Sequence, residues 1–146
     1  MLVPSKRLFY ALEAVLFLAY NTRSGAISSR ALAEQQQLPT RYLEPIMQKL
    51  VRGGLLKSVR GPQGGYVLAR DSKQISLQDV CALLDGDDAI TPPSTMLGRS
   101  ILQPRLDQAS RQWNAVLDSI SMAQLCEEAT EKHIPTAIEP MHDFTI

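Results

Sequence analysis

Hydrophobic residues in the first part of the chain recur with helical spacing. Between residues 5 and 20 they form one face of an amphipathic helix: Leu8, Leu12, Val15, Leu16 and Ala19. Other apolar residues lie elsewhere around this segment: Phe9, Ala11, Phe17 and Leu18. We therefore expect more than one neighbouring element to bury it.

Two further helices are expected before residue 54. Ser28 or Ser29 can cap a short second helix. The third runs from Thr40 or Arg41 to about Arg52, and its apolar stripe consists of Leu43, Ile46, Met47 and Leu50. Pro45 is tolerated only near the first turn, so this helix should begin close to Arg41. A short helix, a tight turn and a helix with a basic, polar outer face are typical of a helix-turn-helix.

Two strand-like runs follow, at residues 55–60 and 66–70, on either side of a Gly-rich and Pro-containing turn. This pattern predicts a β-hairpin with Arg60 at its tip. The fold class is therefore mainly α with a small β-hairpin wing, a winged helix-turn-helix. An alternative is that the hairpin only covers the core and leaves Arg60 solvated.

The second half predicts a long helix for dimerisation. Ser76 with Asp79 resembles a capping box at the start of a fourth helix that ends near residue 84. After a loop at 85–101, apolar residues follow the rhythm of a coiled-coil seam: Leu102, Leu106, Ala109, Trp113, Val116 and Ile120. Pro104 fits only the first turn of this helix. The seam could instead lie on the chain's own core, but the earlier helices already have one another as partners.

The expected domain organisation follows from these elements. Residues 1–84 form the winged helix-turn-helix, 85–101 a loop, 102–133 the dimerisation helix with a short helix that Ser121 and Gln124 cap, and 134–146 a flexible tail. The length of 146 residues suits one ordinary domain with a single core.

Charge is distributed unevenly along the chain. The net charge is zero, yet residues 1–73 hold eleven basic and four acidic side chains, so this half carries +7 and the remainder −7. We expect the first half to face an anionic partner. The chain contains no run of about 18 apolar residues, so the sequence predicts no membrane span. The two cysteines cannot form a disulfide framework, which favours a cytoplasmic location.

Several motifs together resemble one family. They are Ser5-Lys6, Tyr42-Leu43-Glu44, the octet from Val59 to Tyr66, and Ile75-Ser76-Leu77 after it. In these the chain resembles the Rrf2 family of bacterial winged-helix transcription regulators, from about residue 5 to residue 125. The resemblance implies a homodimer that binds a partly palindromic operator in double-stranded DNA. It leaves open whether the protein is a repressor or an activator, and which signal it answers.

The resemblance also implies a set of DNA-binding residues. Glu44 would lie in the major groove, where a carboxylate can accept a hydrogen bond from a cytosine amino group. Thr40, Arg41 and Tyr42 would contact phosphates or base edges at the helix start, while Lys6 and Lys49 would anchor phosphates. The wing, with Arg60, Gly61, Gln63 and Gly64, would enter the minor groove.

One departure from the family pattern concerns iron. Members that bind an iron–sulfur cluster place three cysteines before the dimer helix, but residues 86–104 contain no cysteine or histidine, and Ser100 and Gln103 stand where ligands would be expected. Serine and glutamine are poor iron ligands, so we expect no cluster of this kind. We also expect no other metal site and no catalytic set, so the protein is not an enzyme.

Two rival interpretations remain open. The third helix and the wing could bind a protein instead of DNA. Alternatively, the same regulator could be switched by oxidation of Cys81, although Cys81 and Cys126 both lie on apolar stripes, where cysteines are usually inert.

Overall fold

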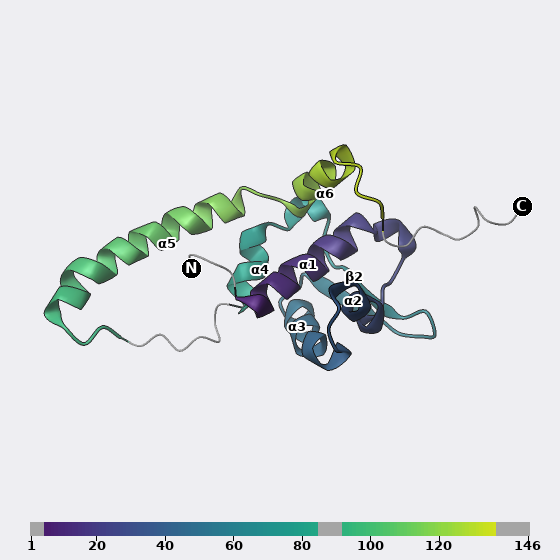
Figure 1. The fold of residues 1–146 in the computed structure, drawn as a ribbon, viewed down its shortest axis with the longest axis horizontal. Coiled ribbons are helices and arrows are strands. Elements are labelled where there is room, and N and C mark those ends of the chain that lie inside the picture. Colours follow the sequence, from purple (N-terminus) through teal and green to yellow (C-terminus); the bar gives the residue numbers. More distant parts are fainter. Residues whose placement is uncertain (1–4, 85–91, 137–146) are drawn as a thin grey trace, which may run out of the picture.

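The computed structural model describes residues 5–84 and 92–136 of the chain (Figure 1). The first part contains α1 (Lys6–Tyr20), η1 (Thr22–Ser24), α2 (Ser29–Gln36), α3 (Thr40–Arg52), β1 (Leu56–Val59), β2 (Gly65–Leu68), η2 (Ser72–Gln74) and α4 (Leu77–Leu84). The second contains η4 (Gly98–Leu102), α5 (Gln103–Asp118) and α6 (Met122–Glu131). The prediction of a mainly helical fold with one hairpin is confirmed.

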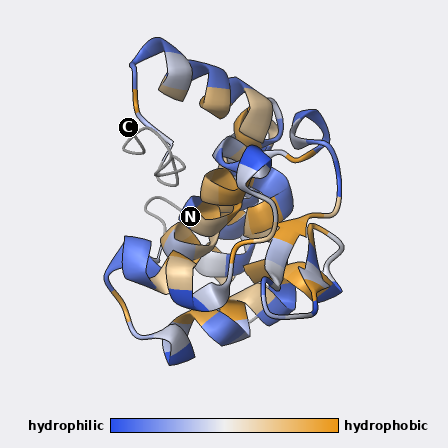
Figure 2. Ribbon diagram, turned by 90° about the vertical axis from the view of Figure 1, so that its right-hand side faces the viewer, coloured by the Kyte–Doolittle hydropathy of each residue, from blue (hydrophilic) through white to orange (hydrophobic). Residues whose placement is uncertain are grey.

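The core lies around α1, which contacts α2, α3, α4, α6 and β2. The expectation of several neighbours is therefore confirmed, and Leu8, Val15 and Ala19 of the predicted face are buried. The buried surface also takes in Ala11, Ala14 and Leu18, whereas Leu12 and Leu16 are only half-buried. Alanines have short side chains, so neighbouring helices can approach α1 closely there. Hydrophobic segments meet inside the domain and the outer turns are hydrophilic (Figure 2).

Serine residues cap the N-termini of four helices. Ser5 and Ser28 accept hydrogen bonds from Leu8 and Ala31 backbone N–H groups at 3.2 and 3.1 Å. At α4, the N–H of Asp79 donates to Ser76 Oγ at 3.1 Å, and the Ser76 N–H donates to the Asp79 carboxylate at 2.9 Å. Ser121 forms the same reciprocal box with Gln124. These caps satisfy N–H groups that a helix leaves without partners, as the sequence predicted.

α3 begins at Thr40 and ends at Arg52, as predicted, and Pro45 lies just beyond its first turn. Proline has no N–H, so the Arg41 carbonyl loses its usual intrahelical donor. Both residues are exposed, so water can hydrate this carbonyl and the helix continues to Arg52.

The hairpin pairs β1 and β2 antiparallel, with Leu56 opposite Leu68 and Val59 opposite Gly65. Tyr66 joins β2 to the segment before α2, because its N–H donates to the Ile27 carbonyl at 2.8 Å and its carbonyl accepts from Ile27 at 3.1 Å. A Cβ on Gly65 would overlap the Ile27 carbonyl. This close approach fixes the base of the wing against the helical core.

The long helical segment differs from its prediction at both ends. Helix begins at Met96 within the predicted loop and passes through the π turn η4 before α5. Pro104 is the second residue of α5, in its first turn as predicted, and it directly follows the π turn, in which the Gln103 N–H donates to the Gly98 carbonyl. A widened turn relieves the clash that proline makes with the preceding turn of a regular helix. The helix ends at Asp118, so Ile120 of the predicted seam lies outside it.

The end of α5 is fastened to the winged domain, while its other end extends away from it (Figure 1). The Leu77 N–H donates to the Ile120 carbonyl at 2.9 Å, and the Met122 N–H donates to the Ile75 carbonyl at 2.8 Å. Residues 85–91 of the predicted loop and 137–146 of the predicted tail lie outside the described residues. Within residues 5–84 and 92–136, no helix is long and apolar enough to cross a membrane.

Candidate nucleic-acid interface

The outer face of α3 carries most of the residues predicted to contact DNA. Leu43, Ile46, Met47 and Leu50 turn inward and are buried. Arg41, Tyr42 and Glu44 are exposed, Tyr42 with 58% of its surface accessible. The Arg41 guanidinium lies 5.2 Å from the centre of the Tyr42 ring, within range of a cation–π interaction. The exposed face therefore offers a cation, a phenol and a carboxylate near the start of the helix.

The wing presents Arg60 and Gln63 to solvent at the tip of the hairpin. Gly61 has a φ of +117°, which L side chains rarely adopt. A Cβ on Gly64 would overlap the Val59 carbonyl oxygen. Glycine at these two positions therefore shapes the turn that holds Arg60 outward.

Three of the predicted residues gather at one place. Lys6, Arg41 and Tyr42 line a hollow of about 640 Å³ between the start of α1 and the start of α3. Lys49 is half-buried near the end of α3 and has an interaction partner of its own. Thr40, at the first position of α3, is half-buried too. The structure thus places Lys6 beside the start of α3, whereas Arg60 lies apart from them at the tip of the hairpin.

The hollow itself was not predicted. Its remaining lining residues are Arg7, Tyr10, Leu38, Pro39, Pro45 and Ile46. The sequence placed Tyr10 and Ile46 in predicted helices but gave no indication that they share a hollow, because no motif links residues so far apart along the chain.

Glu44 lies on the side of α3 that faces the base of the wing. Burial, and then the negative charge of Glu44, raise the pKa of Tyr66 above its usual value. Tyr66 is the residue that ties β2 to Ile27. The carboxylate of α3 and the anchored base of the wing are therefore close enough to interact electrostatically.

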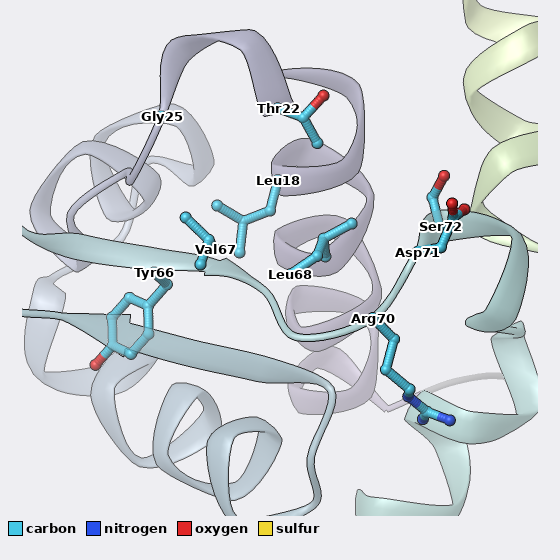
Figure 3. Close-up of a pocket in the computed structure, with 9 residues that line it drawn as sticks. All are labelled: Leu18, Thr22, Gly25, Tyr66, Val67, Leu68, Arg70, Asp71 and Ser72. Atoms are coloured by element: carbon cyan, nitrogen blue, oxygen red, sulfur yellow. The ribbon is translucent and has the colours of Figure 1, made fainter.

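A second hollow, of about 380 Å³, lies behind the wing, between the end of α1 and β2. Figure 3 shows Leu18, Val67 and Leu68 grouped there, with the Arg70 guanidinium pointing away from them. No set of reactive side chains converges in this hollow among the described residues that line it.

The predicted seam of α5 is exposed along its length in the single chain. Leu102, Leu106, Ala109, Trp113 and Val116 are all exposed, and α5 buries none of its residues. Three exposed apolar residues that the sequence analysis missed extend this row: Met96, Leu97 and Ile101. These apolar residues lie five positions apart, from Met96 to Ile101 and from Leu97 to Leu102. This spacing suits a π turn and differs from the three- and four-residue spacing expected of a coiled-coil seam.

The two cysteines differ in exposure. Cys81 is 3% exposed and lies in the core. Cys126 is half-buried, and burial raises the pKa of its thiol. A raised pKa lowers the thiolate fraction of Cys126 at neutral pH, and the core encloses Cys81, so neither position favours a thiol switch.

The fold and this face define a winged helix-turn-helix protein, and comparisons with known proteins agree. A family model described as Rrf2, iron-dependent transcriptional regulator, matches residues 4–128. The chain belongs to the Rrf2 family of transcriptional regulators, whose members are not enzymes.

Individual relatives give the extent of the likeness. IscR of T. potens superposes with a TM-score of 0.76 at 32% identity, over 92% of this chain and 93% of that one. CymR of B. subtilis, the global cysteine regulator, gives 0.69 at 29% identity, over 88% and 98%. IscR of Cronobacter sakazakii is 40% identical over 76 residues, which are 52% of this chain and 47% of that protein. The chain therefore matches about half the length of this curated relative.

The family description names iron, so the donor side chains of this chain bear on whether it can hold that metal. The segment before α5 contains no cysteine or histidine from residue 86 to residue 104. Within residues 5–84 and 92–136, no three His, Cys, Asp or Glu side chains group as metal ligands would. The donor set at this place does not fit an iron–sulfur cluster, which needs thiolates or imidazoles.

Proposed function

We propose that this Rrf2-family regulator binds double-stranded DNA as a homodimer, on a partly palindromic operator. The observation that carries the proposal is the exposed face of α3, where Arg41, Tyr42 and Glu44 stand outward above a fully buried apolar stripe. A rigid helix with such a face suits the major groove of B-DNA.

Each residue of α3 has a distinct part in this proposal. Glu44 reads sequence, because its carboxylate accepts a hydrogen bond from a cytosine amino group. Arg41 and Tyr42, with Thr40, contact phosphates or base edges where the helix enters the groove. Lys6 and Lys49 flank this contact and bind phosphates, which fix position without reading sequence.

The wing supplies a second contact. Arg60 projects from the tip of a hairpin whose turn depends on Gly61 and Gly64, with Gln63 beside it. A narrow minor groove concentrates negative potential and attracts an arginine. The wing therefore adds preference for A·T-rich flanks.

Dimerisation follows from the apolar row of α5. An exposed row of this length is costly in a lone chain, and a second copy that packs along it removes the row from water. Two winged domains in such a dimer would meet half-sites about 34–36 Å apart, on one side of the duplex.

The proposal is tested by the salt dependence of DNA affinity. The full chain is titrated against a pool of fluorescent genomic fragments between ~50 and ~200 mM salt. Several phosphate contacts per dimer should weaken binding by orders of magnitude across this range, because each contact releases counterions. Absence of binding at ~50 mM salt would contradict the proposal and favour a protein partner for α3 and the wing.

A further inference from the structure

We propose that the hollow between the starts of α1 and α3 binds a small apolar anion, a monocarboxylate on an aromatic or branched body, and that this ligand competes with DNA. The competition rests on the function proposed above, whereas the binding does not.

The walls of the hollow are largely apolar. Tyr10 and Ile46 come from two different helices, and Leu38 and Pro39 from the turn that joins α2 to α3. The volume of about 640 Å³ lies within the ~300–1,000 Å³ typical of ligand pockets. The Gln36 amide, which donates to the Tyr10 carbonyl at 3.0 Å, holds α2 against α1 beside it. The site is thus formed by fixed elements.

The charge of the lining selects an anion. Lys6 and Arg41 are exposed side chains of the lining, and none of the nine lining residues is acidic. Arg7, which also lines the hollow, is half-buried and has an interaction partner of its own. Lys6 and Arg41 form no ion pair with any acid in the described part of the chain. A carboxylate between them would gain charge-assisted hydrogen bonds.

A DNA phosphate alone does not account for this geometry. Phosphates are bound by cations and N–H groups on a surface and need no apolar hollow beneath them. A ligand with an apolar body would cover Tyr10 and Leu38, which are half-buried, and the exposed Pro45, and so remove apolar surface from water. Because it would use Lys6 and Arg41, which are also assigned to DNA, one partner excludes the other.

The test uses 2-naphthoate and its uncharged counterpart 2-naphthamide, titrated into the full chain by calorimetry. Naphthoate should bind at least about tenfold more tightly than the amide, because only naphthoate carries the charge that the cations select. The double variant Lys6→Gln/Arg41→Gln should remove this preference, so that naphthoate and the amide bind equally tightly. Lys57→Gln, an exposed cation of β1 outside the hollow, is the matched control and should keep the preference. Equal binding of the two probes, or a preference that survives the double variant, would overturn the proposal.

A second measurement does not depend on the variants. In NMR spectra of the unaltered protein, naphthoate should shift the backbone amide signals of residues 40–44 and not those of α5. Shifts confined to α5 would overturn the site. Naphthoate should also release bound DNA in proportion to its occupancy. If naphthoate binds at the hollow but the protein binds no DNA at any salt, the function proposed above fails and the ligand site stands; if DNA binds and naphthoate does not, the ligand site fails alone.

Discussion

Ser76 Oγ donates a hydrogen bond to Asp118 Oδ1 at 3.2 Å, joining the start of α4 to the end of α5. Backbone bonds between residues 75–77 and residues 120–122 reinforce the junction. The direction in which α5 leaves the winged domain is therefore fixed at this point. In a dimer built along α5, the same junction would set the spacing of the two α3 helices.

Replacing Ser76 should weaken both the cap of α4 and the junction. Ser76→Ala removes the acceptor of the Asp79 N–H and the donor to Asp118, so the free energy of unfolding should fall by about 1–2 kcal/mol. Asp118→Ala removes only the junction bond of an exposed carboxylate and should cost less, roughly 0.5 kcal/mol. Urea titration measures both. Equal losses of unfolding free energy in the two variants would show that the Ser76 cap of α4 adds no stability beyond the hydrogen bond to Asp118.

Replacing Arg60 should weaken DNA binding without changing stability. Arg60→Ala removes the exposed cation of the wing tip, and affinity should fall by about 1–2 kcal/mol, roughly 5- to 30-fold, most strongly on A·T-rich flanks. Fluorescence anisotropy at fixed salt measures the change. Lys73→Ala, an exposed cation of η2, serves as the control. An affinity that does not respond to Arg60→Ala would remove the wing from the interface.

Placing a charge in the apolar row of α5 should separate the dimer. Leu106 is 54% exposed in the single chain, so Leu106→Glu is tolerated within one subunit but would bury a carboxylate between two. Sedimentation equilibrium should give the mass of one chain for this variant and of two for the original. Arg105→Glu, on the neighbouring position of α5, should remain dimeric. A native protein that sediments as one chain would refute dimerisation.

The thiols should react slowly and in a fixed order. Burial raises the pKa of Cys126 and therefore lowers its thiolate fraction at neutral pH, and Cys81 is enclosed in the core. With a disulfide reagent at pH 7, Cys126 should react first, faster as pH rises, and Cys81 only as the protein unfolds. Rapid modification of Cys81 in the folded protein would contradict this expectation and support a regulator that is switched by oxidation of Cys81.

The winged helix-turn-helix was predictable because its signals are local. The stripe Leu43, Ile46, Met47 and Leu50 has helical spacing, and the glycines of the wing mark its turn. The serine caps were equally clear, since a cap and its box residue are three positions apart.

What escaped prediction depended on three-dimensional packing or on rare geometry. The burial of Ala14 in α1 was missed because alanines carry little hydrophobic signal although they permit close packing. The start of the long helix was missed because a π turn adds one residue and shifts the apolar row. The hollow beside α3 was invisible because it joins Tyr10 to residues about thirty positions further along the chain.

The most direct test of the central claim is a hydroxyl-radical footprint of the full chain on a fragment selected from genomic DNA. A homodimer with α3 in the major groove should protect two symmetric patches about 34–36 Å apart on one side of the duplex. A single patch, or no protection at the selected fragment, would contradict the account.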